Sequence, residues 1–420
     1  MTSAIQTPRI FVIVVTYNGK LWLDKCLGTL RHPDIRLDVV IVDNGSTDGT
    51  PDVIRERWPE VTLIETGQNL GFGKANNIGI RYALDKGFDY VYLLNQDAWI
   101  EPEAILRLTE LHRRNPRYGV LSPMQMQADN VTPDANFARC CEAPNCTGYL
   151  ADMAADRSAH DSRAISTPSV AAQTNDSSPA SQTDRTNDSS TGNMGNTPIP
   201  VQQETIIPAS DNCAVSDKRT GNIIGGTHPD RSDCEANMTS APSATLRPTT
   251  GTAGTNHPAG PTGPRHTLRS VYDIRHVMAA HWLISAEAVS KVGGFAPIFS
   301  HYGEDYNYLD RLYYHGMKAG ICPHVCAVHD RAIRPPWSKD LNKAVFMAYN
   351  SVFLPAACDI SVSATRAIAR ALWTVAILSC KYAAKHGSKK PLRLPFMAIA
   401  AIGKIMTTRR ETKIQGALYL

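Results

Sequence analysis

The chain has 420 residues and carries 43 Lys and Arg against 39 Asp and Glu, and this net charge of +4 is too mild to indicate a nucleic-acid-binding protein. Hydrophobic residues make up 43% of the chain, which is enough for a folded core and excludes a wholly disordered protein. The ten cysteines are too sparse for a disulfide framework, no run of about 18 apolar residues predicts a membrane span, and the polar residues 1–9 predict no signal peptide.

Residues 1–127 alternate short β-branched runs with helix signals. This alternation is typical of a mostly parallel sheet with helices on both faces, and ligands of such sheets bind beyond the carboxyl ends of the strands. We therefore predict an α/β fold and expect the functional residues where strands end. The predicted strands are 11–15, 39–42, 61–64, 90–94 and 118–124, and helices are predicted at 21–30, after the N-cap Thr50 and at Glu101-Pro102.

A long stretch without aromatic residues separates Tyr149 from Tyr272. It is rich in Ser, Thr, Asn, Asp, Ala, Pro and Gly, and it repeats the sequence TNDSS at 174–178 and 186–190. Such a composition buries too little apolar surface to offset the conformational entropy of the chain. We interpret residues 128–270 as a low-complexity, disordered insertion, which is either a tether or lid over the acceptor side or an expansion without a role.

The folded pattern resumes at residues 271–338, and the C-terminal residues 339–420 are predicted to be helical with a basic bias. Two helices, near 363–385 and 395–409, place Arg and Lys beside apolar residues. Such helices lie on anionic membrane surfaces, or they pack against the protein and leave their charges in solvent. The sequence leaves both interpretations open.

Polar clusters follow the first three predicted strands. Thr16 and Asn18 end the first strand, and Asp43 opens the run Asp-Asn-Gly-Ser-Thr-Asp-Gly after the second. The glycine-rich stretch that begins at Asn69 contains Lys74. A carboxylate at such a position binds a base N–H or ribose hydroxyls, and backbone N–H groups with a lysine suit a diphosphate. Each cluster taken alone is also typical of an ordinary strand-to-helix turn.

Acidic and histidine side chains mark three later positions. Asp97 follows the fourth strand. A carboxylate at a strand end suits a hard divalent cation that is also bound by phosphate oxygens. The alternative is that Asp97 only caps a turn. Glu304 and Asp305 lie at a predicted helix start, either as a general base with a partner or as ordinary N-terminal charges. His329 ends the last strand, as a metal ligand or as a structural histidine.

Taken in order, these clusters resemble a family-2 inverting glycosyltransferase with the GT-A fold. The rhamnosyltransferase-like branch of bacterial cell-surface polysaccharide synthesis is the most similar. The resemblance implies a Rossmann-like sheet in which residues 1–127 form the nucleotide-sugar-binding half and residues 271–338 form the acceptor and catalytic half. The matching stretches are VIVVTYNG, VVIVDNGSTDGT, NLGFGKANN, YVYLLNQDA, WLISAEAVSKVGGF and YGEDYNYLDRLYYHG.

The resemblance also implies a role for each matching residue. Asp305 is expected to be the catalytic base, with Glu304 as its neighbour. Asp97 matches the last acid of the family's Asp-X-Asp metal motif, whose first acid is replaced by Asn95, and His329 is expected to complete a site for Mg²⁺ or Mn²⁺. The residues expected to bind the nucleotide sugar are Thr16, Asn18, Asp43, Asn69, Lys74, Asn76 and Gln96.

The implied reaction moves a sugar from a nucleoside-diphosphate sugar to a hydroxyl of a glycan or lipid-linked acceptor, with no nucleic-acid partner. The expected location is the cytoplasm, with peripheral contact between the C-terminal region and the inner face of the plasma membrane. Two alternatives remain open. One is another nucleotide-dependent transferase, such as a nucleotidyltransferase. The other is a degenerate, non-catalytic binding subunit, for which Asn95 is the best support.

Overall fold

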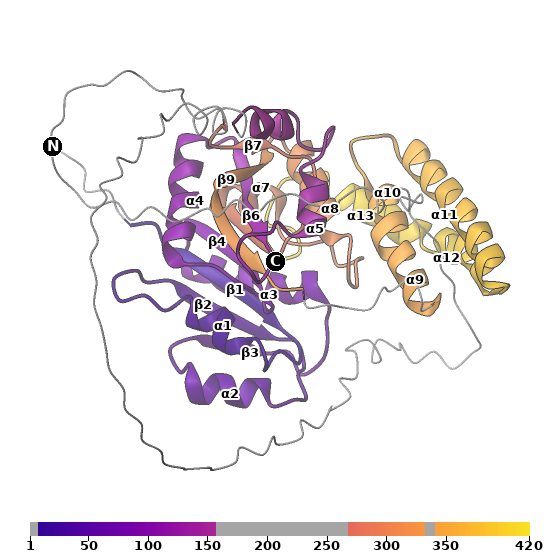
Figure 1. Ribbon diagram of the computed structural model, residues 1–420. Coiled ribbons are helices and arrows are strands. Elements are labelled where there is room, and N and C mark those ends of the chain that lie inside the picture. Colours follow the sequence, from indigo (N-terminus) through magenta and orange to yellow (C-terminus); the bar gives the residue numbers. More distant parts are fainter. Residues whose placement is uncertain (1–6, 157–267, 332–340) are drawn as a thin grey trace, which may run out of the picture.

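Nine strands form one sheet in the computed structural model, which describes residues 7–156, 268–331 and 341–420 (Figure 1). The strand order is β3-β2-β1-β4-β8-β6-β9-β5, and β7 pairs with β9. β1 pairs in parallel with β2 and β4, and β2 pairs in parallel with β3. The strands are β1 (Ile10–Thr16), β2 (Asp38–Asp43), β3 (Thr62–Glu65), β4 (Tyr90–Asn95), β5 (Ala98–Trp99), β6 (Tyr118–Met126), β7 (Tyr272–Asp273), β8 (His281–Ser285) and β9 (Lys318–His329).

Helices cover both faces of the sheet, and each face has its own hydrophobic core. Buried residues of α1, α2 and α4 pack on one face, and those of α3, α5, α7 and α8 pack on the other. This arrangement confirms the predicted α/β fold with a mostly parallel sheet. The helices are α1 (Leu23–Gly28), α2 (Thr50–Arg57), α3 (Phe72–Lys86), α4 (Pro102–Arg114), α5 (Ala135–Cys140), α7 (Ala286–Val292) and α8 (Glu304–Tyr314).

The register of the parallel strands brings their carboxyl ends to one edge of the sheet. Thr16 pairs with Asp43 across β1 and β2, and Val15 pairs with Asn95 across β1 and β4. The apolar runs of these strands are almost wholly buried, so a shift of one residue would move each core side chain into the core on the opposite face. The polar residues that end the strands therefore lie at neighbouring positions.

The chain after residue 267 completes the same sheet. β8 lies antiparallel between β4 and β6, with Leu94 opposite His281. β9 runs parallel to β6 and ends at His329. Strands on both sides of the segment 157–267 thus belong to one sheet, as expected if this segment is an insertion within a single domain.

Helix α3 begins inside the stretch that the sequence indicated as a glycine-rich loop. Only Asn69, Leu70 and Gly71 form a loop, and the helix begins at Phe72. Its glycines are positions of close packing, because a Cβ on Gly73 would lie 2.9 Å from the Cβ of Phe295. A Cβ on Gly79 would lie nearer still to its neighbour, 2.5 Å from Cγ2 of Ile13 in β1. Glycine here serves helix packing as well as the turn.

The expected start of the insertion at residue 128 is too early. Asp134 caps α5 by accepting hydrogen bonds from the N–H groups of Asn136 and Phe137. Phe137 and Tyr149 are buried in the same core as α3 and α8. The sequence missed this segment because its few apolar residues are spaced irregularly among polar ones. The rest of the expected insertion, residues 157–267 with both TNDSS repeats, lies outside the described residues.

The C-terminal residues form a helical layer beside α8, shown in yellow and orange at one side of the sheet in Figure 1. Its core includes Phe353 and Leu354, and it extends to Ala296 and Phe299 before α8. The helix expected near 363–385 is confirmed, whereas the one expected at 395–409 is two helices that meet at Ala401. The elements are α9 (Leu341–Met347), the π-helix η3 (Ala348–Phe353), α10 (Leu354–Cys358), α11 (Ala364–His386), the 3-10 helix η4 (Lys390–Arg393), α12 (Leu394–Ala400) and α13 (Ile402–Glu411).

Helix α11 changes the expectation that no segment could span a membrane. Among the described residues it is the one helix that is long and apolar enough to do so by length and composition. Its most apolar window has a mean hydropathy of 1.2, and 33% of that window is buried inside the protein. Core helices of soluble proteins have similar properties, so length and composition alone do not establish a span.

Candidate active site

The carboxylate of Asp43 organises the turn after β2. It is 2% exposed, and its Oδ1 accepts hydrogen bonds from the hydroxyls of Thr16, at 3.0 Å, and Ser46. Its Oδ2 accepts hydrogen bonds from the N–H groups of Gly45 and Ser46, at 3.2 and 2.9 Å. Four donors from its own neighbourhood therefore surround the side chain that was predicted to bind the nucleoside, and Asp43 at least fixes the shape of this loop.

Asn18 joins the loops that follow β1 and β2. Its backbone is left-handed, with φ of 50°, a conformation that asparagine tolerates better than most residues. Its Oδ1 accepts a hydrogen bond from the N–H of Thr47 at 2.8 Å, and its own N–H donates to Ser46 Oγ at 2.9 Å. Asn18 is exposed, so it lies at the surface of this edge as the prediction requires.

Gln96 clamps the loop after β1 from the end of β4. Its Oε1 accepts a hydrogen bond from the N–H of Tyr17 at 2.8 Å, and its Nε2 donates to the carbonyl of Tyr17 at 3.2 Å. Both ends of the side-chain amide are therefore used within the protein. The sequence predicted a contact with the nucleotide sugar, whereas the structure gives Gln96 a role in positioning the loop.

Asn44 ties the turn after β2 to the loop after β3, and sequence reasoning did not single it out. Its Nδ2 donates to Asn69 Oδ1 at 3.0 Å, and its Oδ1 accepts a hydrogen bond from the N–H of Leu70 at 2.8 Å. Asn69 Oδ1 also accepts a hydrogen bond from the N–H of Gly71 at 2.9 Å. Hydrogen bonds therefore connect the two loops and hold Asn69 directly before α3.

The first turns of α3 carry Lys74, Asn76 and Asn77. Lys74 is exposed, while Asn76 is buried and donates from Nδ2 to the carbonyl of Phe72 at 3.0 Å. Asn77, which the sequence did not indicate, is bonded to the backbone of Phe295 through both ends of its amide. The structure thus leaves Lys74 at the surface and uses Asn76 and Asn77 in packing.

Asp97 and His329 lie together at the predicted metal position. Asp97 Oδ1 is 3.5 Å from His329 Nε2, and both residues are buried. The N–H of Asp330 donates to the carbonyl of Asp97 at 2.8 Å, which holds the end of β9 against this turn. His329 Nδ1 and Asn95 Oδ1 are buried and have no hydrogen-bond partner among the described residues.

These donors fit a hard cation whose other ligands are water and phosphate oxygens. Within the described ranges, no group of three or more His, Cys, Asp or Glu could enclose a metal ion. Mg²⁺ commonly takes one or two carboxylates from the protein and the rest of its ligands from a substrate's phosphates. The pair Asp97 and His329 is compatible with that kind of site and not with a closed structural one.

His281 lies beside His329 at the position predicted for a metal, with 6.5 Å between the two ring centroids. Its two ring nitrogens lie 2.9 Å from the Tyr92 hydroxyl and 2.9 Å from the carbonyl of Val328, the residue before His329. Burial, together with the neighbouring His329, lowers the pKa of His281 to about 3. The ring is therefore neutral, and because both nitrogens have partners it fixes the end of β9 without offering a ligand.

Glu304 and Asp305 form a carboxyl pair in the first turn of α8, as the sequence predicted. Glu304 is 4% exposed, and its Oε2 is buried without a hydrogen-bond partner in the described part of the chain. Burial and then the charge of Asp305 raise the pKa of Glu304 to about 8. Burial also raises the pKa of Asp305, whose Oδ1 accepts a hydrogen bond from the N–H of Tyr306 at 2.8 Å.

Residues 11–137 match the family model described as glycosyl transferase family 2. The chain therefore contains a family 2 glycosyltransferase domain. The match covers β1 to β6 and reaches α5, so it includes Asp43, Asp97 and the loops between them. Glu304, Asp305 and His329 lie outside the matched residues. Glu304 and Asp305 belong to α8, which packs on the same sheet, and His329 ends β9 of that sheet.

Named relatives of this chain are also glycosyltransferases. The N-acetylglucosaminyl-diphospho-decaprenol L-rhamnosyltransferase of Mycobacterium tuberculosis is 38% identical over 31% of this chain and 46% of its own length. The dTDP-rhamnosyl transferase RfbF of Shigella flexneri is 37% identical over 24% of this chain and 33% of its own. The chain thus spans less than half the length of these relatives.

One solved structure covers almost the whole chain. The mannosyltransferase PcManGT from Pyrobaculum calidifontis, in complex with GDP-Man and Mn²⁺, is 15% identical and superposes with a TM-score of 0.40. The similarity covers 97% of this chain and 85% of that structure.

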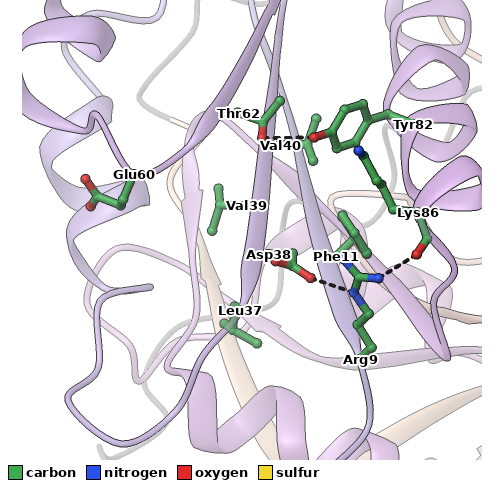
Figure 2. A pocket seen from close by; sticks show the side chains of 10 residues that line it. All are labelled: Arg9, Phe11, Leu37, Asp38, Val39, Val40, Glu60, Thr62, Tyr82 and Lys86. Atoms are coloured by element: carbon green, nitrogen blue, oxygen red, sulfur yellow. Dashed lines mark hydrogen bonds and ion pairs between the residues drawn. The ribbon is translucent and has the colours of Figure 1, made fainter.

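A surface hollow of about 310 Å³ lies at the opposite end of the sheet from the site of the family 2 domain. Figure 2 shows its lining, where Arg9 forms an ion pair of 3.0 Å with Asp38 and also meets the carbonyl of Lys86. Arg9 and Asp38 precede or begin β1 and β2, at the amino ends of these strands. Since ligands of parallel sheets bind at the carboxyl ends, this hollow is not the candidate site.

The surroundings of Asp305 come from segments that sequence reasoning did not connect with it. His276 opposes the rise in the pKa of Asp305, and its ring centroid lies 4.7 Å from that of Tyr306. His276 Nε2 lies 3.0 Å from Asp310 Oδ1, and the backbone N–H of His276 donates to Asn145 Oδ1 at 2.8 Å. Asn145 belongs to the folded part of the expected insertion, so no local pattern could have indicated this contact.

Proposed function

We propose that this protein is an inverting glycosyltransferase that moves a sugar from a nucleoside-diphosphate sugar to a hydroxyl of a glycan or lipid-linked acceptor. One observation carries the proposal: the carboxyl pair of α8 lies against the start of α3 in the family 2 domain. A Cβ on Gly73 would lie 3.6 Å from the Cβ of Glu304. Helix α8, which carries the candidate base, therefore packs against the family 2 domain at Glu304.

Asp305 is the group we assign as catalytic base. The acceptor oxygen attacks the anomeric carbon while its proton passes to the Asp305 carboxylate. The bond from that carbon to the diphosphate breaks, and the nucleoside diphosphate leaves with the electron pair. Attack from the face opposite the leaving group inverts the anomeric configuration. Two adjacent carboxyl groups that are shielded from water do not readily ionise together, because their negative charges repel each other. A proton held on Glu304 therefore allows Asp305 to be ionised.

Asp97 and His329 are the residues that would hold Mg²⁺ or Mn²⁺. A divalent cation bound there would stabilise the negative charge that gathers on the diphosphate. Asn95 stands where the motif has its first acid, so the protein supplies one fewer charge to the cation. We therefore expect weak metal binding by the protein alone and tighter binding with a nucleoside diphosphate.

The names of the relatives support a narrower proposal for donor and acceptor. Two of them are named rhamnosyltransferases, and one name includes a decaprenol-linked acceptor. We therefore propose rhamnosyl transfer in cell-surface polysaccharide synthesis as the activity to test first. A lipid-linked acceptor would place the enzyme in the cytoplasm, in peripheral contact with the inner face of the plasma membrane.

A thermal-shift screen against UDP-, dTDP- and GDP-sugars, with and without Mn²⁺, tests the donor class. A ligand that binds the folded state raises the melting temperature, so the donor should stabilise the protein more than the other nucleotides do. Product formation with that donor then tests the reaction. A folded protein that neither binds nor hydrolyses any of these sugars would contradict the proposal.

A non-catalytic binding subunit is the second candidate, and Asn95 is the observation that favours it. The carboxyl pair weighs against it, because Glu304 keeps a buried oxygen with no hydrogen-bond partner among the described residues, which a purely structural residue would not need. Donor binding without hydrolysis or transfer, in the presence of metal, would support the binding subunit.

A further inference from the structure

Two adjacent C-terminal helices expose large apolar side chains. On α11, Trp373 is 71% exposed and Ile377 is 42% exposed, one turn apart. On α12, Phe396 is 72% exposed and Ile399 is 55% exposed, again one turn apart. α11 contacts both η4 and α12, so these side chains belong to neighbouring elements. Exposed large apolar groups gathered on adjacent elements mark interaction surfaces.

Basic residues extend the apolar stripe of α11 at both ends. Arg366 and Arg370 precede Trp373 at helical spacing, and Lys381 follows Ile377 by one turn. These three basic residues are exposed. The stripe therefore has an apolar centre with cationic ends on a single face of the helix.

The charge of the whole chain is concentrated in this region. Residues 341–420 contain twelve Lys and Arg and only two Asp and Glu, whereas the complete chain has a net charge of only +4. Most of these basic residues are exposed, and the exception, Arg409, is buried and donates to backbone carbonyls. The C-terminal layer is thus strongly cationic on a protein that is otherwise slightly acidic.

We infer that the outward stripes of α11 and α12 form a docking face for a bilayer that contains anionic lipids. The docking face is defined by Trp373, Ile377, Phe396 and Ile399 with the basic residues beside them. Aromatic and aliphatic side chains enter the interfacial region of a bilayer, and Lys and Arg attract anionic headgroups. This inference goes beyond the proposed transfer reaction and is tested without it.

The packing of α11 indicates that the helix lies on the membrane and does not cross it. Its opposite side is buried in the C-terminal core through Ala371 and Val375. Arg366 and Arg370 lie within the helix at one end, and Lys381 and Lys385 lie within it at the other. A span would pull the helix out of this core and bring charged residues into the hydrocarbon, where each is costly.

A bilayer explains this surface better than a second copy of the chain does. A second copy would bring the same basic residues against each other, and like charges repel. An anionic bilayer meets both the apolar and the cationic groups. The layer that carries the face is joined to the segment before α8, because the Ser300 hydroxyl donates to Asn350 Oδ1 in η3 at 3.1 Å.

Vesicle flotation of the full chain tests the docking face. We expect the protein to float with vesicles of phosphatidylcholine and phosphatidylglycerol, to bind phosphatidylcholine alone much less, and to be released by high salt. Trp373→Glu and Phe396→Glu should each lower the affinity for the mixed vesicles at least about tenfold, since each removes one inserted side chain. Trp373→Phe should retain most of the binding.

Leu21→Glu is the matched control, because Leu21 is 83% exposed but lies before α1 in the family 2 domain. Circular dichroism should confirm that all variants are folded, as expected for exposed positions. Wild-type flotation by Trp373→Glu and Phe396→Glu would overturn the inference. So would failure of the wild-type chain to bind mixed vesicles, or resistance of bound protein to alkaline carbonate, which indicates a spanning helix.

Discussion

The side-chain amide of Asn77 makes two hydrogen bonds with the backbone of Phe295, 218 residues further along the chain. Nδ2 donates to the carbonyl at 2.8 Å, and Oδ1 accepts from the N–H at 2.7 Å. Asn77 belongs to the family 2 domain, and Phe295 precedes the loop that leads to Glu304 and Asp305. This pair of bonds joins the two parts of the candidate active site.

Asn77→Ala should destabilise the protein by about 2–4 kcal/mol, because it leaves a buried N–H and a buried carbonyl of Phe295 without partners. Urea unfolding of the two proteins would measure the loss. Arg81→Ala, at an exposed position on the same helix, should change the free energy of unfolding by less than about 0.5 kcal/mol. Equal urea midpoints for Asn77→Ala and the wild type would mean that these two hydrogen bonds contribute nothing to the stability of the protein.

Asp305→Asn should lower the transfer rate about 10²–10⁴-fold, since the amide cannot accept the acceptor's proton. Donor affinity should stay nearly unchanged, because the side chain acts on the acceptor hydroxyl. Single-turnover assays and calorimetry would measure the two quantities separately. Wild-type turnover by this variant would show that the base is another residue.

Glu304 should make stability depend on pH. Its pKa is raised from 4.5 to about 8, so between these values the folded state binds a proton that the unfolded state has lost. The free energy of unfolding contributed by this carboxyl therefore falls as pH rises from about 4.5 to about 8. Asp305, whose pKa is also raised, adds a change of the same sign.

Glu304→Gln should flatten this dependence, because glutamine imitates the protonated acid at every pH. Urea unfolding at intervals between pH 5 and pH 8 would reveal the difference in slope. Asp52→Asn, an exposed substitution on α2, is the control and should keep the wild-type slope. If the free energy of unfolding of Glu304→Gln depends on pH as steeply as that of the wild type, the Glu304 carboxyl is not the cause of the dependence.

The parts of the site that follow from local pattern were predicted, and the parts that depend on distant contacts were not. Strand ends and the helix start at Glu304 are local, and the structure has them where the sequence indicated. Asn44, Asn77 and His276 act through hydrogen bonds to other segments, and an isolated asparagine or histidine carries no sign of its partner. The same limit explains why the hydrogen bond between Gln96 and the backbone of Tyr17 was not predicted from the sequence.

Removal of the Asp97 carboxylate should weaken metal binding. Asp97→Asn should raise the Mn²⁺ concentration for half-maximal binding at least about tenfold in the presence of a nucleoside diphosphate, and His329→Ala should act in the same direction. Calorimetric titration of Mn²⁺ into the nucleotide-saturated protein measures this without any turnover. Asn95→Asp should act in the opposite direction, because it restores a second carboxylate beside Asp97 and raises the negative charge facing the cation. If Asn95→Asp binds Mn²⁺ no more tightly and Asp97→Asn binds it equally well, this edge of the sheet does not hold the metal.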